Sequence, residues 1–187
     1  MRRLVSDLGR FGRSCLRQLA PARPGPQDEA LDALQAEVSR LWLRTGLGGE
    51  VKINLQRYDD GSWHVEFVDG RYEMIATERG KEVGRKPRLT LNEATRWHVF
   101  SAVYGRSLSR ELEEREAPVP ARKVENGLDD DGYSRWNWMA PTIEIMGRVS
   151  PEYEEWVRAY YAQALARAPL AAYEIRNAKY PLPGEDV

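Results

Sequence analysis

The chain has 187 residues, of which 42% are hydrophobic and 30% are charged, and its formal net charge is −1. This length and composition predict a single folded domain with a real core. No run of residues approaches the roughly 20 apolar residues that a transmembrane helix needs. Cys15 is the single cysteine, so an intramolecular disulfide is excluded and a reducing, cytoplasmic setting is favoured.

The charge is spread unevenly along the chain. Residues 1–23 hold six arginines and one aspartate, a net charge of +5, which leaves −6 on the rest. Apolar residues at helical spacing predict a basic amphipathic helix at 2–20, and three prolines mark a linker at 21–27. This arm is interpreted as a helix that docks on the body or as a partly ordered extension, with an interfacial membrane helix or a nucleic-acid arm as the alternatives. We expect no nucleic-acid partner, and membrane contact through 2–20 stays open, as does the oligomeric state.

The body begins with a helix and then changes to strand patterns. A helix is predicted at 28–45, where glycines end it. Turn signals at Asp59–Gly61 and Asp69–Gly70 separate alternating segments, which predicts a three-stranded antiparallel meander over about 50–79. Its first strand is expected at 51–58, and residues 78–82 are interpreted as a charged turn that leads into the next helix.

Three further helices are predicted, at 91–115, 134–148 and 151–167. Thr90 and Glu93 have capping-box spacing, and Ser150–Pro151 is a typical helix start. Because a sheet with one apolar face must be covered, the fold class is predicted as α+β, with the meander packed against about four helices and the amphipathic arm in front. The chain divides into the arm and linker at 1–26, one domain at 27–168 and an extended tail at 169–187.

The aromatic residues suggest both core and surface roles. Trp97, Phe100 and Tyr104 recur at helical spacing and are predicted to face the core. Trp42 and Trp138 fall off the main apolar stripes, and we interpret them as exposed aromatics of the kind that anchor protein interfaces.

Motifs for catalysis are missing from the sequence. His64 and His98 have no metal-ligand spacing to each other or to Cys15. Asp129–Gly132 faintly resembles a calcium loop, but Tyr133 and Ser134 stand where a ligand and a glycine belong. Without a serine-nucleophile motif, a phosphate loop or a dinucleotide fingerprint, we expect no catalytic residue, no cofactor and no metal. An enzyme that uses Glu78, Glu82 and the three aspartates is the weakest alternative.

The order of several segments carries a family resemblance. These are TERGKEVGRKPRLTLNEA, the aromatic helix after it, ELEER, an aspartate before SRWNWM, and IEIMGRVSPEYEEWVRAYY. Together they resemble immunity protein family 63 of bacterial polymorphic toxin systems, over roughly residues 50–165. The chain departs from the pattern in its long loop at 116–130 and in Trp136, which replaces a basic residue. The resemblance implies a non-catalytic protein that binds and neutralises one cognate protein toxin inside the producing bacterium.

The partner surface is predicted from charge. Residues 111–131 hold eight acids against three bases, and an acidic patch accelerates encounter with a basic partner such as a nuclease toxin. The predicted partner-binding residues are Glu78, Arg79, Glu82, Glu113, Glu114, Asp129, Asp130, Asp131 and Trp138. The alternative function is a membrane-surface or regulatory adaptor that is anchored through the basic N-terminal helix.

Overall fold

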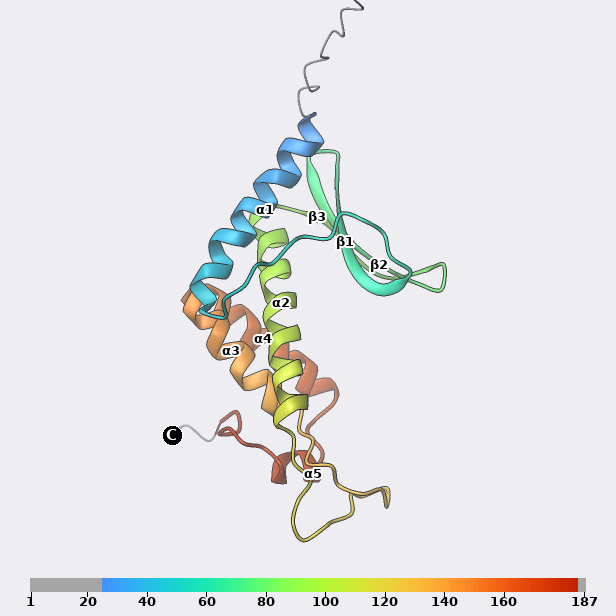
Figure 1. The fold of residues 1–187 in the computed structure, drawn as a ribbon, viewed down its shortest axis with the longest axis vertical. Coiled ribbons are helices and arrows are strands. Elements are labelled where there is room, and N and C mark those ends of the chain that lie inside the picture. The colour runs from blue at the N-terminus through green and yellow to red at the C-terminus, as the bar shows by residue number, and fades with distance from the viewer. Residues whose placement is uncertain (1–24, 185–187) are drawn as a thin grey trace, which may run out of the picture.

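The computed structural model describes residues 25–184 (Figure 1). The helix predicted at 2–20 and residues 21–24 of the linker lie outside the described residues. The elements in chain order are α1 (Pro26–Thr45), β1 (Asp60–Val68), β2 (Arg71–Glu78), β3 (Lys81–Leu89), α2 (Leu91–Glu114), α3 (Trp136–Val149), α4 (Pro151–Arg167) and α5 (Ala172–Arg176). A three-stranded antiparallel sheet in the order β1-β2-β3 stands beside four longer helices, so the predicted α+β class is confirmed.

Helix α2 is the axis of the molecule (Figure 1). It contacts α1 and α3 along its length, and α3 in turn packs on α4. The sheet contacts α1 and α2 at one end of this bundle. The loop between α2 and α3 lies at the opposite end together with α5 (Figure 1). The bundle therefore holds the sheet and the loop apart.

Two helix starts match their sequence signals. The Thr90 hydroxyl accepts a hydrogen bond from Glu93 N at 3.3 Å, and the Glu93 carboxylate accepts one from Thr90 N at 2.8 Å. Ser150 caps α4 by accepting from Tyr153 N at 3.2 Å, with Pro151 as the first helical residue. Each cap satisfies backbone N–H groups that have no partner within their helix.

The first strand of the meander was wrongly predicted at 51–58. This segment runs beside β1 and makes one backbone hydrogen bond there, from Val65 N to Asn54 O at 2.9 Å. It is fixed mainly by Gln35 of α1, whose side chain donates to Val51 O at 2.9 Å and accepts from Ile53 N at 2.8 Å. A side chain therefore replaces the ladder that would make this segment a strand.

The third strand is β3, which the sequence pattern did not predict. Arg79 and Gly80 have φ values of 50° and 74°, so residues 78–81 form a tight hairpin turn rather than a passage into a helix. β3 is an edge strand with charged side chains, Gly84 and Pro87. Edge strands commonly carry such residues, which limit pairing with other chains and also hide the apolar alternation on which a sequence prediction depends.

The core forms where the four helices meet the sheet. Leu34, Val38, Met74, Val99 and Met146 are all 1% exposed or less. On α2 the innermost side chains are those of Ala94, Val99 and Val103, whereas Trp97 is only half-buried. Tyr104 is also half-buried, but Phe100 is 6% exposed, so the predicted core position is confirmed for Phe100 and only partly met by Trp97 and Tyr104.

The predicted exposure of two tryptophans is wrong. Trp42 is 2% exposed, and its indole N–H donates to the carbonyls of Gly48 and Gly49 at 3.0 and 3.2 Å. Trp138 is 9% exposed and packs its ring edge-to-face on Tyr104, with 5.1 Å between the ring centroids. Both rings are buried because the neighbouring loop or helix supplies a partner for the polar end of the indole or a ring for its face.

The C-terminal segment is not simply extended, because it contains α5 and is tied to α3. Arg135 makes a bidentate ion pair with Glu174, with both nitrogen–oxygen distances at 2.7 Å. Trp136 donates to Pro181 O at 2.6 Å, and Asn137 binds the backbone of residues 177 and 179. These contacts place α5 beside the α2–α3 loop.

Candidate partner-binding surface

The long loop between α2 and α3 has a defined hairpin at its centre. Val124 N donates to Leu128 O, and Asp130 N donates to Arg122 O, both at 2.9 Å. Lys123 and Asp129 form an isolated antiparallel bridge and a salt bridge of 2.7 Å. The hairpin turns at Gly127, where φ is +82°. Its tip therefore presents a fixed set of side chains.

Asp130 fastens the hairpin to the body. It is 4% exposed, and its carboxylate accepts hydrogen bonds from Gly132 N at 3.0 Å and from the Asn177 amide at 2.7 Å. Burial alone would raise the pKa of Asp130, but these two hydrogen bonds and the nearby charge of Arg122 outweigh it and hold the pKa below its usual value. Asp130 is therefore a structural carboxylate and is not available to a partner.

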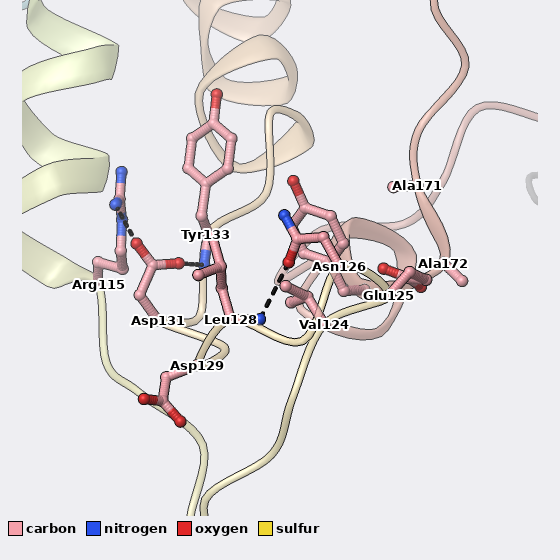
Figure 2. A pocket seen from close by; sticks show the side chains of 11 residues that line it. Arg115, Val124, Glu125, Asn126, Leu128, Asp129, Asp131, Tyr133, Ala171 and Ala172 are labelled. Carbon is pink, nitrogen blue, oxygen red and sulfur yellow. Dashed lines mark hydrogen bonds and ion pairs between the residues drawn. The ribbon is translucent and has the colours of Figure 1, made fainter.

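Arg115, the C-cap residue of α2, connects this helix to the part of the loop that contains Asp131 and Tyr133. Its guanidinium donates to the buried Glu111 carboxylate at 2.8 and 3.1 Å. Its second partner is Asp131, whose carboxylate accepts a hydrogen bond at 2.8 Å (Figure 2). It also lies over the Tyr133 ring, 4.7 Å from the centroid. The hydrogen bond with Glu111 is the largest contribution that raises the pKa of Arg115. The pairing fixes Asp131 and Tyr133 in place.

These residues border a cavity of about 810 Å³, which we call the loop hollow (Figure 2). Its apolar lining comes from the hairpin, from the segment between the hairpin and α3, and from the start of α5; it consists of Val124, Leu128, Tyr133, Ala171, Ala172 and Tyr173. Leu128 is 65% exposed at its edge. An exposed apolar side chain beside a hollow is a common anchor for a protein partner.

The charged lining of the loop hollow is mainly acidic. Glu125, Asp129 and Asp131 are set against Arg115, which gives a net charge of −2. Asp129 and Asp131 keep 80% and 62% of their side-chain surface exposed although each has an ion-pair partner. An apolar floor with an acidic rim is complementary to a side chain that has an apolar stem and a positive end, as lysine and arginine have.

The predicted partner-binding residues separate into three groups. Asp129 and Asp131 border the loop hollow, and Glu113 and Glu114 are exposed on the last turn of α2, which leads into the loop. Asp130 and Trp138 are buried. Glu78, Arg79 and Glu82 lie at the β2–β3 turn, far from the loop (Figure 1). There Arg85 pairs with both Glu82 and Glu73, and its hydrogen bond lowers the pKa of Glu82.

Several residues of the hollow were missed from the sequence. Leu128 and Val124 lie within the acidic segment, where the surrounding charges hide the apolar pair from a sequence pattern. Tyr173 comes from α5, 40 residues after Tyr133, and no local pattern connects the two. A single exposed leucine inside a charged loop is the one signal that would have indicated the hollow.

Within residues 25–184 no group of three or more His, Cys, Asp or Glu side chains is arranged to hold a metal ion. No helix in the same range is both long and apolar enough to cross a membrane.

Comparison with protein families identifies the chain. The family described as Immunity protein 63 matches residues 69–163, which is just over half of the 187 residues. The chain belongs to the Immunity protein 63 family. No curated protein and no solved structure matches it.

The residues matched by the family model show which elements the chain shares with the family. The match spans β2, β3, α2, α3 and all but the end of α4, together with the α2–α3 loop. The resemblance inferred from the sequence is confirmed, although it began near residue 50 and the match begins at 69. Helix α1 and α5 lie outside the match, so one part of the loop hollow comes from the shared region and the other from the C-terminal segment.

Proposed function

We propose that this Immunity protein 63 family member binds and neutralises a cognate protein toxin in the cytoplasm of the producing bacterium, and that it does so without catalysis. The observation that carries this proposal is the loop hollow, which joins an exposed apolar anchor to an acidic rim on a rigid helical scaffold. An inhibitor needs such a complementary surface rather than a reactive group.

The partner that fits the hollow is a basic segment of the toxin. Toxins that act on nucleic acids carry positive charge because they bind phosphate, and a lysine or arginine stem packs on Leu128 and Tyr133 while its charge meets Asp129 and Glu125. Asp131 is held by Arg115 and contributes to the local potential. Glu113 and Glu114 extend the same negative potential along the end of α2.

The proposal is tested by co-expression. The toxin domain encoded by the neighbouring reading frame is induced in a bacterium with or without this chain. Wild-type chain is expected to restore growth and to co-purify with the toxin domain. A variant with Leu128→Asp, which alters only an exposed position, is expected to fold normally and to protect less. Growth arrest that the wild-type chain fails to relieve, with no complex on co-purification, would contradict the proposal.

The competing adaptor function depends on the basic arm at 2–20, which lies outside the described residues. The co-expression experiment distinguishes this adaptor function from toxin neutralisation. If the chain neutralises a toxin through its folded domain, a chain that begins at Gln27 is expected to protect as well as the full chain. Loss of protection on removing the arm would mean that the arm takes part in toxin binding.

A further inference from the structure

A second cavity lies between the sheet and the helices, and none of its residues belongs to the loop hollow. Its volume is about 310 Å³, which is at the lower end of the range for small-ligand pockets. Most of its lining is aromatic, with rings from β1, α2, α3 and α4: Trp63, Trp97, Phe100, Tyr104, Trp138, Tyr160 and Tyr161. We call it the aromatic cavity.

Gly84 of β3 leaves the space that the Trp63 ring occupies beside this cavity. This residue lies opposite Trp63 across the sheet, through Ala76 of the strand between them. A Cβ atom on Gly84 would lie 2.7 Å from the Trp63 ring, which is too close for any side chain. The glycine in β3 therefore lets the Trp63 indole lie across the strand and form one wall of the aromatic cavity.

Lys86 places a positive charge among these rings. Its ammonium lies 3.4 Å from the centroid of the Trp97 ring and 5.2 Å from that of Trp63. Among the described residues that line the cavity, Lys86 alone is charged. Both rings attract the cation through their π faces, so the side chain is held at the cavity.

Side chains along β3 point alternately to the two faces of the sheet, which explains why this lysine has no carboxylate partner. Arg85 points to the outer face of the sheet, where it pairs with Glu73 and Glu82. Lys86 points to the helix-facing side, beside Met74 of the neighbouring strand. No described carboxylate lies within ion-pair distance of Lys86, and partial burial lowers the pKa of its ammonium group.

From the ring-lined walls and the unpaired ammonium of Lys86, we propose that the aromatic cavity binds a planar apolar group that carries a carboxylate. The rings receive the apolar body by stacking and edge-to-face contact, and Lys86 pairs with the carboxylate. The half-buried Ser101 hydroxyl is a further polar group in the lining. The ligand is either a free aryl carboxylate or a peptide that ends in an aromatic residue.

The probes are 3-phenylpropionate, its amide, and the tripeptide acetyl-Ala-Ala-Phe with a free carboxyl end. None of them absorbs at the excitation wavelength of tryptophan, so binding is read from the fluorescence of Trp63, Trp97 and Trp138 in the full chain. The carboxylate is expected to bind saturably and about fivefold more tightly than the amide, the effect of one partly exposed ion pair. Tighter binding of the tripeptide than of 3-phenylpropionate would identify the source as a chain end, and the reverse would identify a free small molecule.

Lys86→Met keeps the apolar stem and removes the charge, and Lys81→Met is the matched control because Lys81 is an exposed lysine on the same strand. Lys86→Met is expected to remove the preference for the carboxylate over the amide, while Lys81→Met leaves it unchanged. Ala164→Leu, which narrows the cavity without removing a ring, is expected to weaken the binding of both the carboxylate and the amide. Equal binding of carboxylate and amide to the wild-type chain, or no saturable binding up to the solubility limit, would overturn the proposal.

This test is independent of toxin binding. Lys86→Met is expected to protect against the toxin as well as the wild-type chain does, so failure at the aromatic cavity and failure at the loop hollow are distinguishable.

Discussion

At the residue scale, three consecutive aspartates that look alike in sequence have three different environments. Asp129 is exposed beside Lys123, Asp130 is buried against Asn177, and Asp131 pairs with Arg115. The local sequence pattern predicted that all three lie on a charged loop. It could not predict the partner that buries Asp130, because Asn177 lies 47 residues away in the chain. The distinction between a rim carboxylate and a structural one therefore depends on tertiary contacts that the sequence does not display.

Two glycines of the loop allow the cost of backbone strain to be compared with the cost of steric overlap. Gly127 and Gly132 have φ values of +82° and +83°, but a Cβ on Gly127 meets nothing within 4 Å, whereas on Gly132 it would lie 2.0 Å from Glu116 O. We expect Gly127→Ala to lower the free energy of unfolding by about 1–2 kcal/mol. Gly132→Ala is expected to cost more than about 3 kcal/mol, because strain and overlap add. Urea unfolding checks both, and equal costs would mean that Gly132 has room to move.

His98 predicts a dependence of stability on pH. It is 9% exposed, and burial lowers its pKa from 6.5 to about 4. Because the folded-state pKa is depressed, the unfolded chain takes up a proton first as pH falls below about 6.5, and stability decreases from there down to about pH 4. The full loss is about 3 kcal/mol.

The measurement is the free energy of unfolding at several pH values between 6.5 and 5, a range above that in which carboxylates usually titrate. His98→Gln removes this titration and is expected to flatten the profile over that range. An identical slope in the wild type and the variant would show that His98 is accessible to protons in the folded state.

At the scale of elements, predictions succeeded where a local signal is strong. The Asp69–Gly70 hairpin and the Thr90 cap were both predicted and are both present, because the residue types themselves favour those conformations. The strand at 51–58 was wrong because Gln35, on another element, holds that segment. β3 was missed because the charges suited to an edge strand resemble those of a loop.

The docking of α5 depends on the Arg135–Glu174 pair. Both partners are largely buried, and burial opposes ionisation of Glu174, but the hydrogen bonds from Arg135 and Ala171 keep its pKa below the usual value. We expect Glu174→Gln to cost about 3 kcal/mol, because it leaves the Arg135 charge without its partner. Since α5 is peripheral, we expect the loss to appear as faster hydrogen exchange over residues 169–184, with α2 and α3 unchanged.

The matched control is Glu144→Gln. Glu144 and Arg148 are also 2.7 Å apart, but they are 65% and 48% exposed. Their pair is expected to contribute less than about 0.5 kcal/mol. Similar effects of the two substitutions would contradict the view that burial sets the strength of the Arg135–Glu174 pair.

At the scale of the whole molecule, the bundle separates two groups of acids that the sequence analysis combined into one surface. The β2–β3 turn carries Glu78 and Glu82, and the α2–α3 loop carries Glu125, Asp129 and Asp131, at different ends of the fold (Figure 1). The charge pattern predicted that residues 111–131 form an acidic surface, but a charge pattern gives no distance between two segments of the chain. We therefore propose one partner patch of standard size, about 800 Å² on each protein, at the loop alone.

The apolar part of the proposed interface gives its own prediction. Leu128 is 65% exposed and supports no described core contact, so Leu128→Ala is expected to leave stability within about 0.5 kcal/mol of the wild type. Anchor residues act mainly on dissociation. We expect the variant to dissociate from the toxin domain about fivefold to thirtyfold faster, as measured by surface-based kinetics. Leu112→Ala, which removes a similarly exposed leucine of α2 (64%), is the control and is expected to change little.

If the acidic rim of the loop hollow meets a basic toxin, its charge controls the rate at which the two proteins associate. Two double variants change the net charge equally: Glu125→Lys with Asp129→Lys at the hollow, and Glu78→Lys with Glu82→Lys at the β2–β3 turn. We expect only the first to slow association with the toxin domain at low salt and to flatten its salt dependence, with both variants folded by circular dichroism. Unchanged association for the loop variant, together with slowed association for the turn variant, would contradict an interface at the loop hollow and move it to the sheet.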